Sequence, residues 1–305
     1  MTSSLCKIRR FSAIAFMAFA IFALAGCASV PQSQSGLQSG ALAPGKGTFN
    51  FDNWAGPDIR VWYQLPDRVT EATPVVFVMH GRGRDADRYR DEWSALAAGH
   101  GYILIVPEFD NDGFPGSRSY NHGNFAGKDG EPIPRERWSF SAIEPLFDEV
   151  LRLTGSQVDT YGIYGHSAGA QFVHRFALFT PEARYHRAIS ANAGSYAMPD
   201  LDTDYPFGLA GAPVTEADLG IVLGKPLMVL LGTADNDPNH RSLPDAPAAQ
   251  AQGPHRLARG QAFVAAGEAA AGRLGVPFGW QVSFVEGVGH KNGEMAVAAA
   301  ELLDE

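Results

Sequence analysis

Short apolar stretches alternate with amphipathic stretches along most of the chain. Strand patterns occur at residues 59–65, 75–79, 102–106, 158–164, 188–191, 227–231 and 280–285. Helical patterns occur at residues 86–98, 141–153, 171–178, 256–274 and 293–303. Several of the strands are apolar throughout, as expected for strands buried on both faces. The alternation therefore predicts an α/β fold, with a mostly parallel sheet covered by helices on both sides.

One strand-to-helix junction carries a candidate nucleophile. The strand pattern that begins at Val158 is followed by Gly165-His166-Ser167-Ala168-Gly169 and then by a helical pattern. A tight turn there would raise the Ser167 hydroxyl above the sheet, and only small residues would fit two positions before and two after it. Gly165 and Gly169 occupy those positions. A plain Gly/Ser turn between two buried elements is the structural alternative.

The first 47 residues have the composition of a leader and a tether. Residues 1–26 contain three basic residues and then an uncharged run from Phe11 to Ala25, which is shorter than a membrane-spanning helix requires. Leu24-Ala25-Gly26-Cys27 resembles the bacterial lipobox, which implies cleavage before Cys27 and lipidation of that cysteine. Residues 27–47 then form a lipidated Cys and flexible tether, and residues 48–305 form one catalytic domain. Ala28 after the cysteine favours the outer membrane if the host is Gram-negative.

The charge and the cysteine content of the chain argue against nucleic-acid binding and against disulfide bonds. Loss of residues 1–26 leaves 21 of the 24 Lys and Arg against 33 Asp and Glu, so the formal net charge changes from −9 to −12. Such an acidic domain is a poor candidate for binding nucleic acid. The two cysteines are Cys6, lost with the leader, and Cys27, so no disulfide is expected. No His/Cys/Asp cluster has metal-ligand spacing, and neither a metal nor a cofactor is expected.

A serine nucleophile needs an imidazole base and a carboxylate that orients it. Among nine histidines, His290 alone follows a late strand and precedes a helix, whereas His240 and His255 lie in a Pro-rich loop. Two carboxylates follow the apolar strand 227–231, in Gly232-Thr233-Ala234-Asp235-Asn236-Asp237. Ligand chemistry in parallel sheets gathers at the carboxyl ends of strands. Asp235 is therefore the expected acid and Asp237 its alternative, although either could be a turn residue that caps its own backbone.

Ser167, Asp235 and His290 occur in the chain order of the α/β-hydrolase superfamily, which the chain resembles from about residue 59 to 303. Within it, His80-Gly81, Gly-Thr-Ala-Asp and Gly-x-Gly-His are similar to secreted esterases of the polyhydroxybutyrate-depolymerase and feruloyl-esterase-like group. The superfamily resemblance implies an oxyanion hole from the backbone amides of Arg82 and Ala168. His80 is expected to brace that loop.

The expected activity is hydrolysis of small or polymeric carboxylic esters in the cell envelope through an acyl-enzyme. His166 and Tyr196 are possible pocket residues, and the loops 108–137 and 236–254 are expected to shape the acyl and alcohol sites. The same triad serves peptidases, acyltransferases and metal-free perhydrolases, and a non-catalytic lipoprotein binding module is a further alternative. The natural substrate and the oligomeric state stay open.

Overall fold

The computed structural model describes residues 41–304, and the expected leader and Cys27 lie outside them. Eight strands form one sheet in the order β1-β2-β4-β3-β5-β6-β7-β8. Their bounds are β1 Gly45–Phe51, β2 Ile59–Leu65, β3 Val75–Met79, β4 Ile103–Glu108, β5 Tyr161–His166, β6 Tyr185–Ala191, β7 Leu227–Gly232 and β8 Gln281–Val285. β2 pairs antiparallel with both β1 and β4, and all the other pairs are parallel. The predicted mostly parallel α/β architecture is confirmed.

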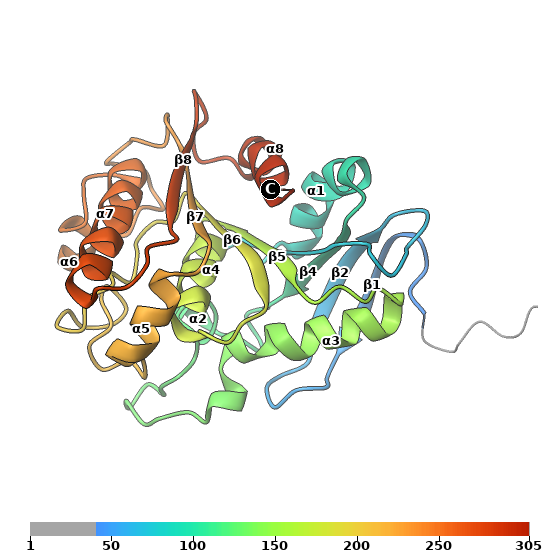
Figure 1. Ribbon diagram of the computed structural model, residues 1–305, viewed down its shortest axis with the longest axis horizontal. Helices are drawn as coiled ribbons and strands as arrows, with labels where there is room; N and C mark the ends of the chain where they lie inside the picture. The colour runs from blue at the N-terminus through green and yellow to red at the C-terminus, as the bar shows by residue number, and fades with distance from the viewer. Residues whose placement is uncertain (1–40, 305) are drawn as a thin grey trace, which may run out of the picture. The chain divides into compact units, whose positions relative to one another are not determined.

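Helices cover both faces of this sheet (Figure 1). The bounds are α1 Ala86–His100, α2 Gly116–Ser119, α3 Ile143–Thr154, α4 Ala168–Phe179, α5 Glu216–Leu223, α6 Pro247–Gln250, α7 Arg256–Leu274 and α8 Asn292–Leu303, with 3-10 turns at Arg135–Arg137 and Ser139–Ala142. α1 and α8 share one apolar core with Val76 and Val78 of β3. α3, α4, α5 and α7 share the other core with Val75 and Phe77. Alternate residues of one strand thus enter two cores, which explains why β3 is apolar throughout.

Besides the short helices α2 and α6 and the 3-10 turns, β1, β4 and α5 differ from the expectation. β1 begins at Gly45, inside the range expected as tether, because its backbone pairs with β2 and buries Phe51. β4 extends through Pro107 to Glu108, beyond the expected end at residue 106. Pairing with β3 ends at Ile105, so only β2 pairs at the proline, as at an edge strand. α5 was not expected, although Thr215 and Asp218 form a capping box at its start.

Buried arginines tie three long connections to the framework. Arg84 donates to the carbonyls of Phe109, Phe114 and Gly116, and Arg175 donates to that of Pro206. Arg259 donates to the carbonyls of Gly194, Pro244 and Gly253. All three side chains are buried. In each case the guanidinium satisfies main-chain oxygens that a packed loop would otherwise leave without a donor.

Candidate active site

The turn between β5 and α4 holds Ser167 in a strained backbone conformation, with φ 59° and ψ −112°. A Cβ on Gly165 would overlap the carbonyl of Gly169 and lie 2.9 Å from the amide nitrogen of Ala170. A Cβ on Gly169 would overlap the carbonyl oxygen of Met79 and lie 2.6 Å from its carbonyl carbon. The close approach on both sides of Ser167 is therefore as the sequence predicted, and glycine is required because backbone fills the space.

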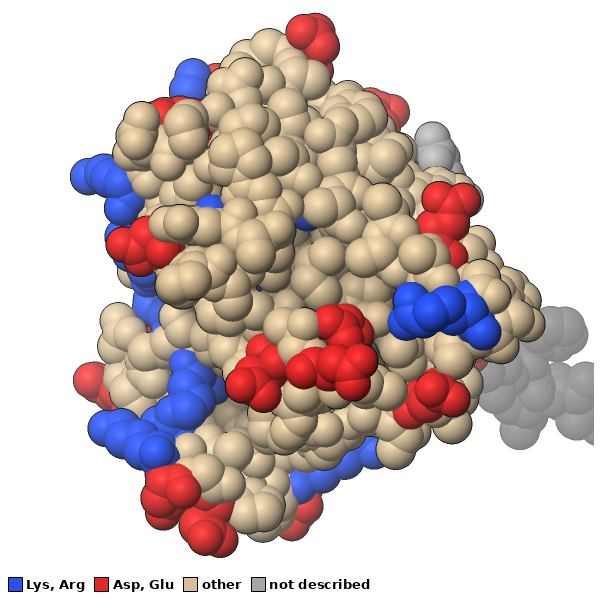
Figure 2. All heavy atoms as spheres, turned by 90° about the vertical axis from the view of Figure 1, so that its left-hand side faces the viewer, with Lys and Arg blue, Asp and Glu red and all other residues tan. Residues whose placement is uncertain are grey.

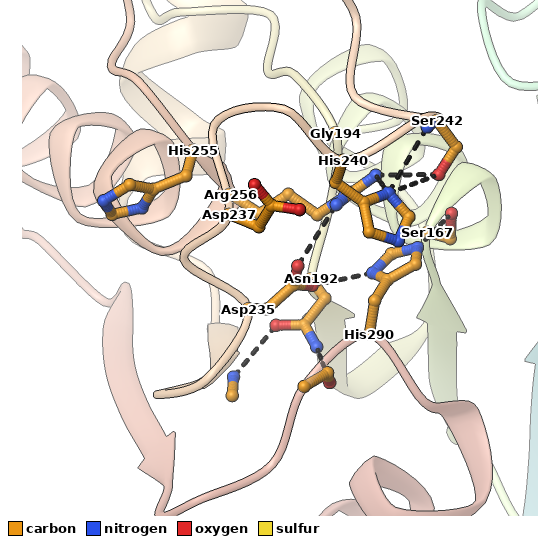
Figure 3. Close-up of polar contacts among 12 residues, drawn as sticks. Ser167, Asn192, Gly194, Asp235, Asp237, His240, Ser242, His255, Arg256 and His290 are labelled. Carbon is orange, nitrogen blue, oxygen red and sulfur yellow. Dashed lines mark hydrogen bonds and ion pairs between the residues drawn. The ribbon is translucent and has the colours of Figure 1, made fainter.

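Ser167, His290 and Asp235 meet above the carboxyl ends of β5, β7 and β8 (Figure 3). The Nε2 atom of His290 lies 3.0 Å from the Ser167 Oγ, and its Nδ1 lies 2.7 Å from the Asp235 Oδ2. When Nδ1 carries the ring proton and donates it in a hydrogen bond to the carboxylate, Nε2 accepts a hydrogen bond from the Ser167 hydroxyl. Residues far apart in the sequence thus form one continuous hydrogen-bonded chain.

Asp235, rather than Asp237, contacts the imidazole. The Asp235 side chain is only 3% exposed, and its second oxygen, Oδ1, accepts a hydrogen bond from Arg256 Nη1 at 3.1 Å. Burial raises the pKa of Asp235, but the hydrogen bond and charge of His290, together with the charge of Arg256, outweigh burial and lower it below the usual value. Asp237 is exposed, and its Oδ1 accepts the amide of Asn239 at 2.9 Å, as a turn residue does.

Asn192, at the end of β6, braces both partners of the serine. Its Oδ1 accepts the amide of Gly232 at 2.9 Å, and its Nδ2 donates to the carbonyl of Gly289 at 3.2 Å (Figure 3). Gly232 precedes the acid loop and Gly289 immediately precedes His290. The backbone of Asn192 has φ 52°, a conformation that asparagine tolerates better than most residues. One buried amide therefore fixes the spacing between acid and base.

The loop after β3 lies beside the nucleophile. The amide of Phe109 donates to His80 Nε2 at 3.0 Å, so the His80 ring carries its proton on Nδ1, 3.0 Å from the carbonyl of Gly81. Burial lowers the pKa of His80 to about 4, so the ring is neutral and braces the loop as expected. Gly81, Arg82 and Ser167 line one cavity, and the Arg82 side chain is exposed. The oxyanion role of the Arg82 and Ala168 amides stays a prediction.

The His290 ring lies near two other imidazoles. The ring centroid of His166 lies 4.6 Å from that of His290, and the centroid of His240 lies 5.3 Å from it. Burial lowers the pKa of His166 well below its usual value, and the neighbouring charges of His290, Arg256 and Arg88 act in the same direction. His166 is thus a neutral ring packed against His290, and it also lines the cavity.

Tyr196 does not form a pocket wall. Its side chain is fully buried, and its ring stacks on Phe263 with centroids 4.6 Å apart. Its backbone amide and carbonyl are both held by the side chain of Gln252, at 2.9 and 2.7 Å. The expectation was wrong because the chain turns inward after β6 and places this aromatic side chain in the core beneath α7.

The cavity over Ser167 has a volume of about 660 Å³ and a polar lining. It is lined by Gly81, Arg82, Gly83, Asp85, Arg88, Tyr89, Glu92, His166, Ser167, His240, Arg241, Ser242, His290, Lys291, Asn292, Gly293 and Glu294. No aliphatic side chain occurs among these residues. Arg88 pairs with Asp85 and Glu92, and Lys291 pairs with Glu294. Among residues 41–304, no ion pair engages Arg82 or Arg241.

The two long loops contribute unequally to this cavity. The loop 236–254 supplies His240, Arg241 and Ser242, as expected. The loop 108–137 supplies no lining residue and instead supports the site from the side. Its Tyr120 donates to the carbonyl of His80 at 2.7 Å, and its Asn121 donates to Gln171 on α4 at 3.2 Å. The loop also lines a second cavity, through Arg118, His122, Phe125 and Ala126. That it shapes an acyl or alcohol site stays a prediction.

Sequence reasoning missed Arg256 and Asn192. Arg256 was noted only as the start of a helix, yet a basic residue is unfavourable at that end, which is a signal that it has an acidic partner. Asn192 directly follows the strand pattern at residues 188–191. Its two contacts join segments 40 and 97 residues away, so no local pattern could have shown them.

The face of the molecule in Figure 2 shows no extended basic patch: its basic side chains lie mainly toward the edges, and a group of acidic side chains lies near the lower centre. Within residues 41–304, no helix is long and apolar enough to cross a membrane. No group of three or more His, Cys, Asp or Glu in the same residues is arranged to hold a metal ion.

Comparison with known proteins gives a clear likeness among solved structures. No protein-family model and no curated protein matches the chain. The chain is 50% identical to poly(aspartic acid) hydrolase-1 from Sphingomonas sp. KT-1, over 87% of this chain and 100% of that one, with a TM-score of 0.86. It is 35% identical to a poly(3-hydroxybutyrate) depolymerase from Bordetella parapertussis, over 85% of this chain and 90% of that one, with a TM-score of 0.79.

A third likeness concerns the fold alone. An S-formylglutathione hydrolase from Agrobacterium tumefaciens is 16% identical over 86% of this chain and 95% of that one, with a TM-score of 0.56. The two higher identities, together with the strand–turn–helix around Ser167, establish the superfamily. The protein belongs to the α/β-hydrolase superfamily and is a serine hydrolase of its esterase and depolymerase group.

Proposed function

We propose that the protein hydrolyses carboxylic esters through an acyl-enzyme, with Ser167 as nucleophile, His290 as general base and acid, and Asp235 as the group that orients His290. The observation that carries this proposal is the continuous hydrogen-bonded chain Asp235–His290–Ser167, with distances of 2.7 and 3.0 Å. These distances suit proton transfer from the hydroxyl to the imidazole. The strained turn at Ser167 favours the same role, since it exposes the hydroxyl to the cavity.

The reaction proceeds in two steps. In the first, the Ser167 oxygen attacks the substrate carbonyl while His290 Nε2 takes its proton, and the imidazolium then protonates the leaving alcohol. In the second, His290 removes a proton from water, the hydroxide attacks the acyl-enzyme, and the acid leaves as Ser167 regains its proton. The negative Asp235 carboxylate stabilises the imidazolium in both steps. The amides of Ala168 and Arg82 are the proposed donors to the oxyanion.

The lining of the cavity favours a polar substrate. Without aliphatic side chains beside Ser167, a long acyl chain would gain little by leaving water, since the hydrophobic gain scales with the apolar area that is buried. The cations Arg82 and Arg241 would attract carboxylates on the substrate. We therefore propose short or hydrophilic acyl groups, small or within a polymer, as the natural substrates.

Amide hydrolysis in an acidic polymer is a second candidate. It is favoured by the 50% identity to a poly(aspartic acid) hydrolase and by Arg82 and Arg241 at the cavity. The same triad cleaves amides when the leaving amine is protonated by the imidazolium. On this proposal the acidic net charge of the domain is countered locally, where the substrate binds.

The proposed place of action is the cell envelope. Residues 1–26 would act as a lipoprotein signal peptide, and Cys27 would carry the lipid that attaches the domain to the outer membrane. The composition of residues 1–47 supports this proposal. Expression of the chain with Cys27→Ser tests it, since the variant should shift from the membrane fraction to the soluble fraction of the envelope.

Loss of the nucleophile tests the activity. Ser167→Ala should abolish hydrolysis of p-nitrophenyl acetate and labelling by a fluorophosphonate, while the folded fraction by circular dichroism stays that of the parent. A mutant that turns over and labels like the parent contradicts the proposal. Complete lack of labelling in the folded parent would favour the non-catalytic binding module.

A panel of ester and amide substrates shows whether the protein prefers to hydrolyse ester bonds or amide bonds. Initial rates on p-nitrophenyl esters of increasing chain length, poly(3-hydroxybutyrate) film and poly(aspartic acid) should favour short esters and the acidic polymer. Arg82→Gln with Arg241→Gln should lower kcat/KM for poly(aspartic acid) about tenfold at low salt and leave p-nitrophenyl acetate unchanged. Arg60→Gln, an exposed arginine on β2 away from the cavity, is the matched control. Equal losses on both substrates would exclude recognition of carboxylates.

A further inference from the structure

Arg256 contacts both the acid and the wall of the cavity (Figure 3). Its guanidinium, 1% exposed, lies at the start of α7 and donates through Nη1 to Asp235 Oδ1 at 3.1 Å. Through Nη2 it donates to Ser242 Oγ at 2.9 Å and reaches His240 Nδ1 at 3.4 Å. Asp235 orients His290, whereas His240 and Ser242 line the cavity. One buried side chain therefore spans two parts of the site.

The start of α7 also holds the main chain of the acid. The amide of Leu257 donates to the backbone carbonyl of Asp235 at 3.3 Å. A positive charge at a helix N-terminus is opposed by the helix dipole, and burial of a guanidinium is unfavourable unless it is paired. Both penalties are offset only by the Asp235 carboxylate and the two groups of the loop. This accounts for an arginine at a position where helix formation alone disfavours one.

We propose that Arg256 is a positioning residue, which holds the Asp235 carboxylate against His290 and holds residues 240–242 against the substrate cavity. The inference rests on the proposed function, because it assigns Arg256 a part in a reaction that uses the triad. A single guanidinium then fixes the position of the Asp235–His290–Ser167 chain relative to the cavity wall formed by residues 240–242. Arg241 lies between the two residues that Arg256 contacts, so its place in the cavity depends on the same group.

The charge and the geometry of Arg256 can be separated by two substitutions. Arg256→Met removes the positive charge, so a proton binds more readily to the Asp235–His290 pair, and the acid limb of the pH profile moves upward. Arg256→Lys keeps a charge near Asp235 but cannot reach both the carboxylate and Ser242. The other titratable or charged groups that face the guanidinium are His166, Tyr196, Asp237, His240 and Arg259. They are unchanged in both variants.

The experiment measures kcat and KM for p-nitrophenyl acetate between pH 5 and 9. Arg256→Met should lower kcat by about tenfold to a hundredfold and raise the acid limb by about one pH unit, as expected for loss of a buried neighbouring charge. Arg256→Lys should show the acid limb at the pH of the parent, because a positive charge is kept, but should have a raised KM. Ser242→Ala removes the contact with Arg256 and the 3.1 Å contact with His240 Nδ1 but leaves Asp235 untouched, so it should raise KM and leave the acid limb of the pH profile unchanged.

Two controls separate this inference from its premise. Arg175→Lys removes another buried guanidinium, one that contacts carbonyls and Gln171 but no triad residue, and it should lower the melting temperature with the pH profile intact. Ser167→Ala must be inactive. If it retains activity, the proposed function fails; if it is inactive but Arg256→Met keeps the kcat and pH limb of the parent, only the inference is overturned.

The inference does not depend on the folding of Arg256→Met. If that variant does not fold, Arg256→Lys and Ser242→Ala decide the outcome. A raised KM in both, with the pH limb of the parent, supports the proposal. Values of KM equal to those of the parent in both variants overturn it.

Discussion

Substitution of Gly169 by alanine should damage both the stability and the activity of this protein. The glycine is the second residue of α4, where helix propensity alone would favour alanine by about 1 kcal/mol. Packing reverses that preference. The new Cβ would lie 2.6 Å from the carbonyl carbon of Met79 and 2.8 Å from the carbonyl oxygen of His80. Ordinary contact begins near 3.4 Å, and the Met79 carbonyl oxygen lies nearer than its carbon, so the end of β3 must move by more than about 0.8 Å.

That movement affects the loop that starts at Gly81 and Arg82. Forced displacement of packed backbone costs about 1–3 kcal/mol or more, which corresponds to a melting temperature lower by roughly 2–6 °C for a domain of this size. A misplacement near 1 Å in a catalytic loop can lower the rate by about a hundredfold. Thermal unfolding by circular dichroism and kcat/KM on p-nitrophenyl acetate measure the two effects.

Gly272→Ala is the matched control, because Gly272 lies in α7 with nothing within 4 Å of an added Cβ. It should be neutral or stabilising by up to about 1 kcal/mol. If Gly169→Ala also melts at or above the temperature of the parent with the parent's kcat/KM, the steric account of the turn around Ser167 is wrong.

Three further outcomes follow from the site. Asp235→Asn should lower kcat by about 10⁴-fold while Asp237→Asn keeps the activity of the parent, and steady-state rates showing the reverse would make Asp237 the acid. Asn192→Ala leaves the buried Gly232 amide without its acceptor, so it should lower the free energy of unfolding, measured in urea, by about 2–3 kcal/mol and reduce kcat. Asn192→Gly should show the same reduced kcat as Asn192→Ala, since backbone strain is not the cause. Burial lowers the pKa of His80 from 6.5 to about 4, so the unfolded chain binds the extra proton and the stability from His80 is lost as the pH falls below 6.5, by about 2 kcal/mol at pH 5. Urea unfolding of His80→Asn should show a weaker loss over that range than the parent, and an equal loss would exclude His80 as the source.

The sequence predicted best what depends on neighbouring residues. The turn at Ser167 could be recognised because its strand, glycines and helix are adjacent in the chain. His290 and Asp235 could be proposed because parallel strands bring their carboxyl ends to one edge of the sheet, and the structure places both side chains in one hydrogen-bonded chain with Ser167. β1 could not be predicted in this way, because its Gly-rich sequence resembles a linker. It becomes a strand only through its backbone pairing with β2.

Side-chain direction could not be predicted in the same way. Tyr196 follows a strand end beside the nucleophile, yet its ring lies in the core, because the chain turns under α7. Arg256 and Asn192 act through contacts that cross the domain. The loop 108–137 was expected from its length to shape the acyl and alcohol sites, and its hydrogen bond from Tyr120 to the His80 carbonyl, which supports the neighbouring loop, could not be read from the sequence.

The buried arginines Arg84, Arg175 and Arg259 hold their loops mainly by main-chain carbonyls. Every residue type offers the same carbonyl oxygen, so mutations in these loops can change the exposed side chains and leave the anchorage intact. Change in the surface around Ser167, Asp235 and His290 is thereby separated from the stability of the fold, so single substitutions in these loops can alter the exposed side chains at little cost in stability.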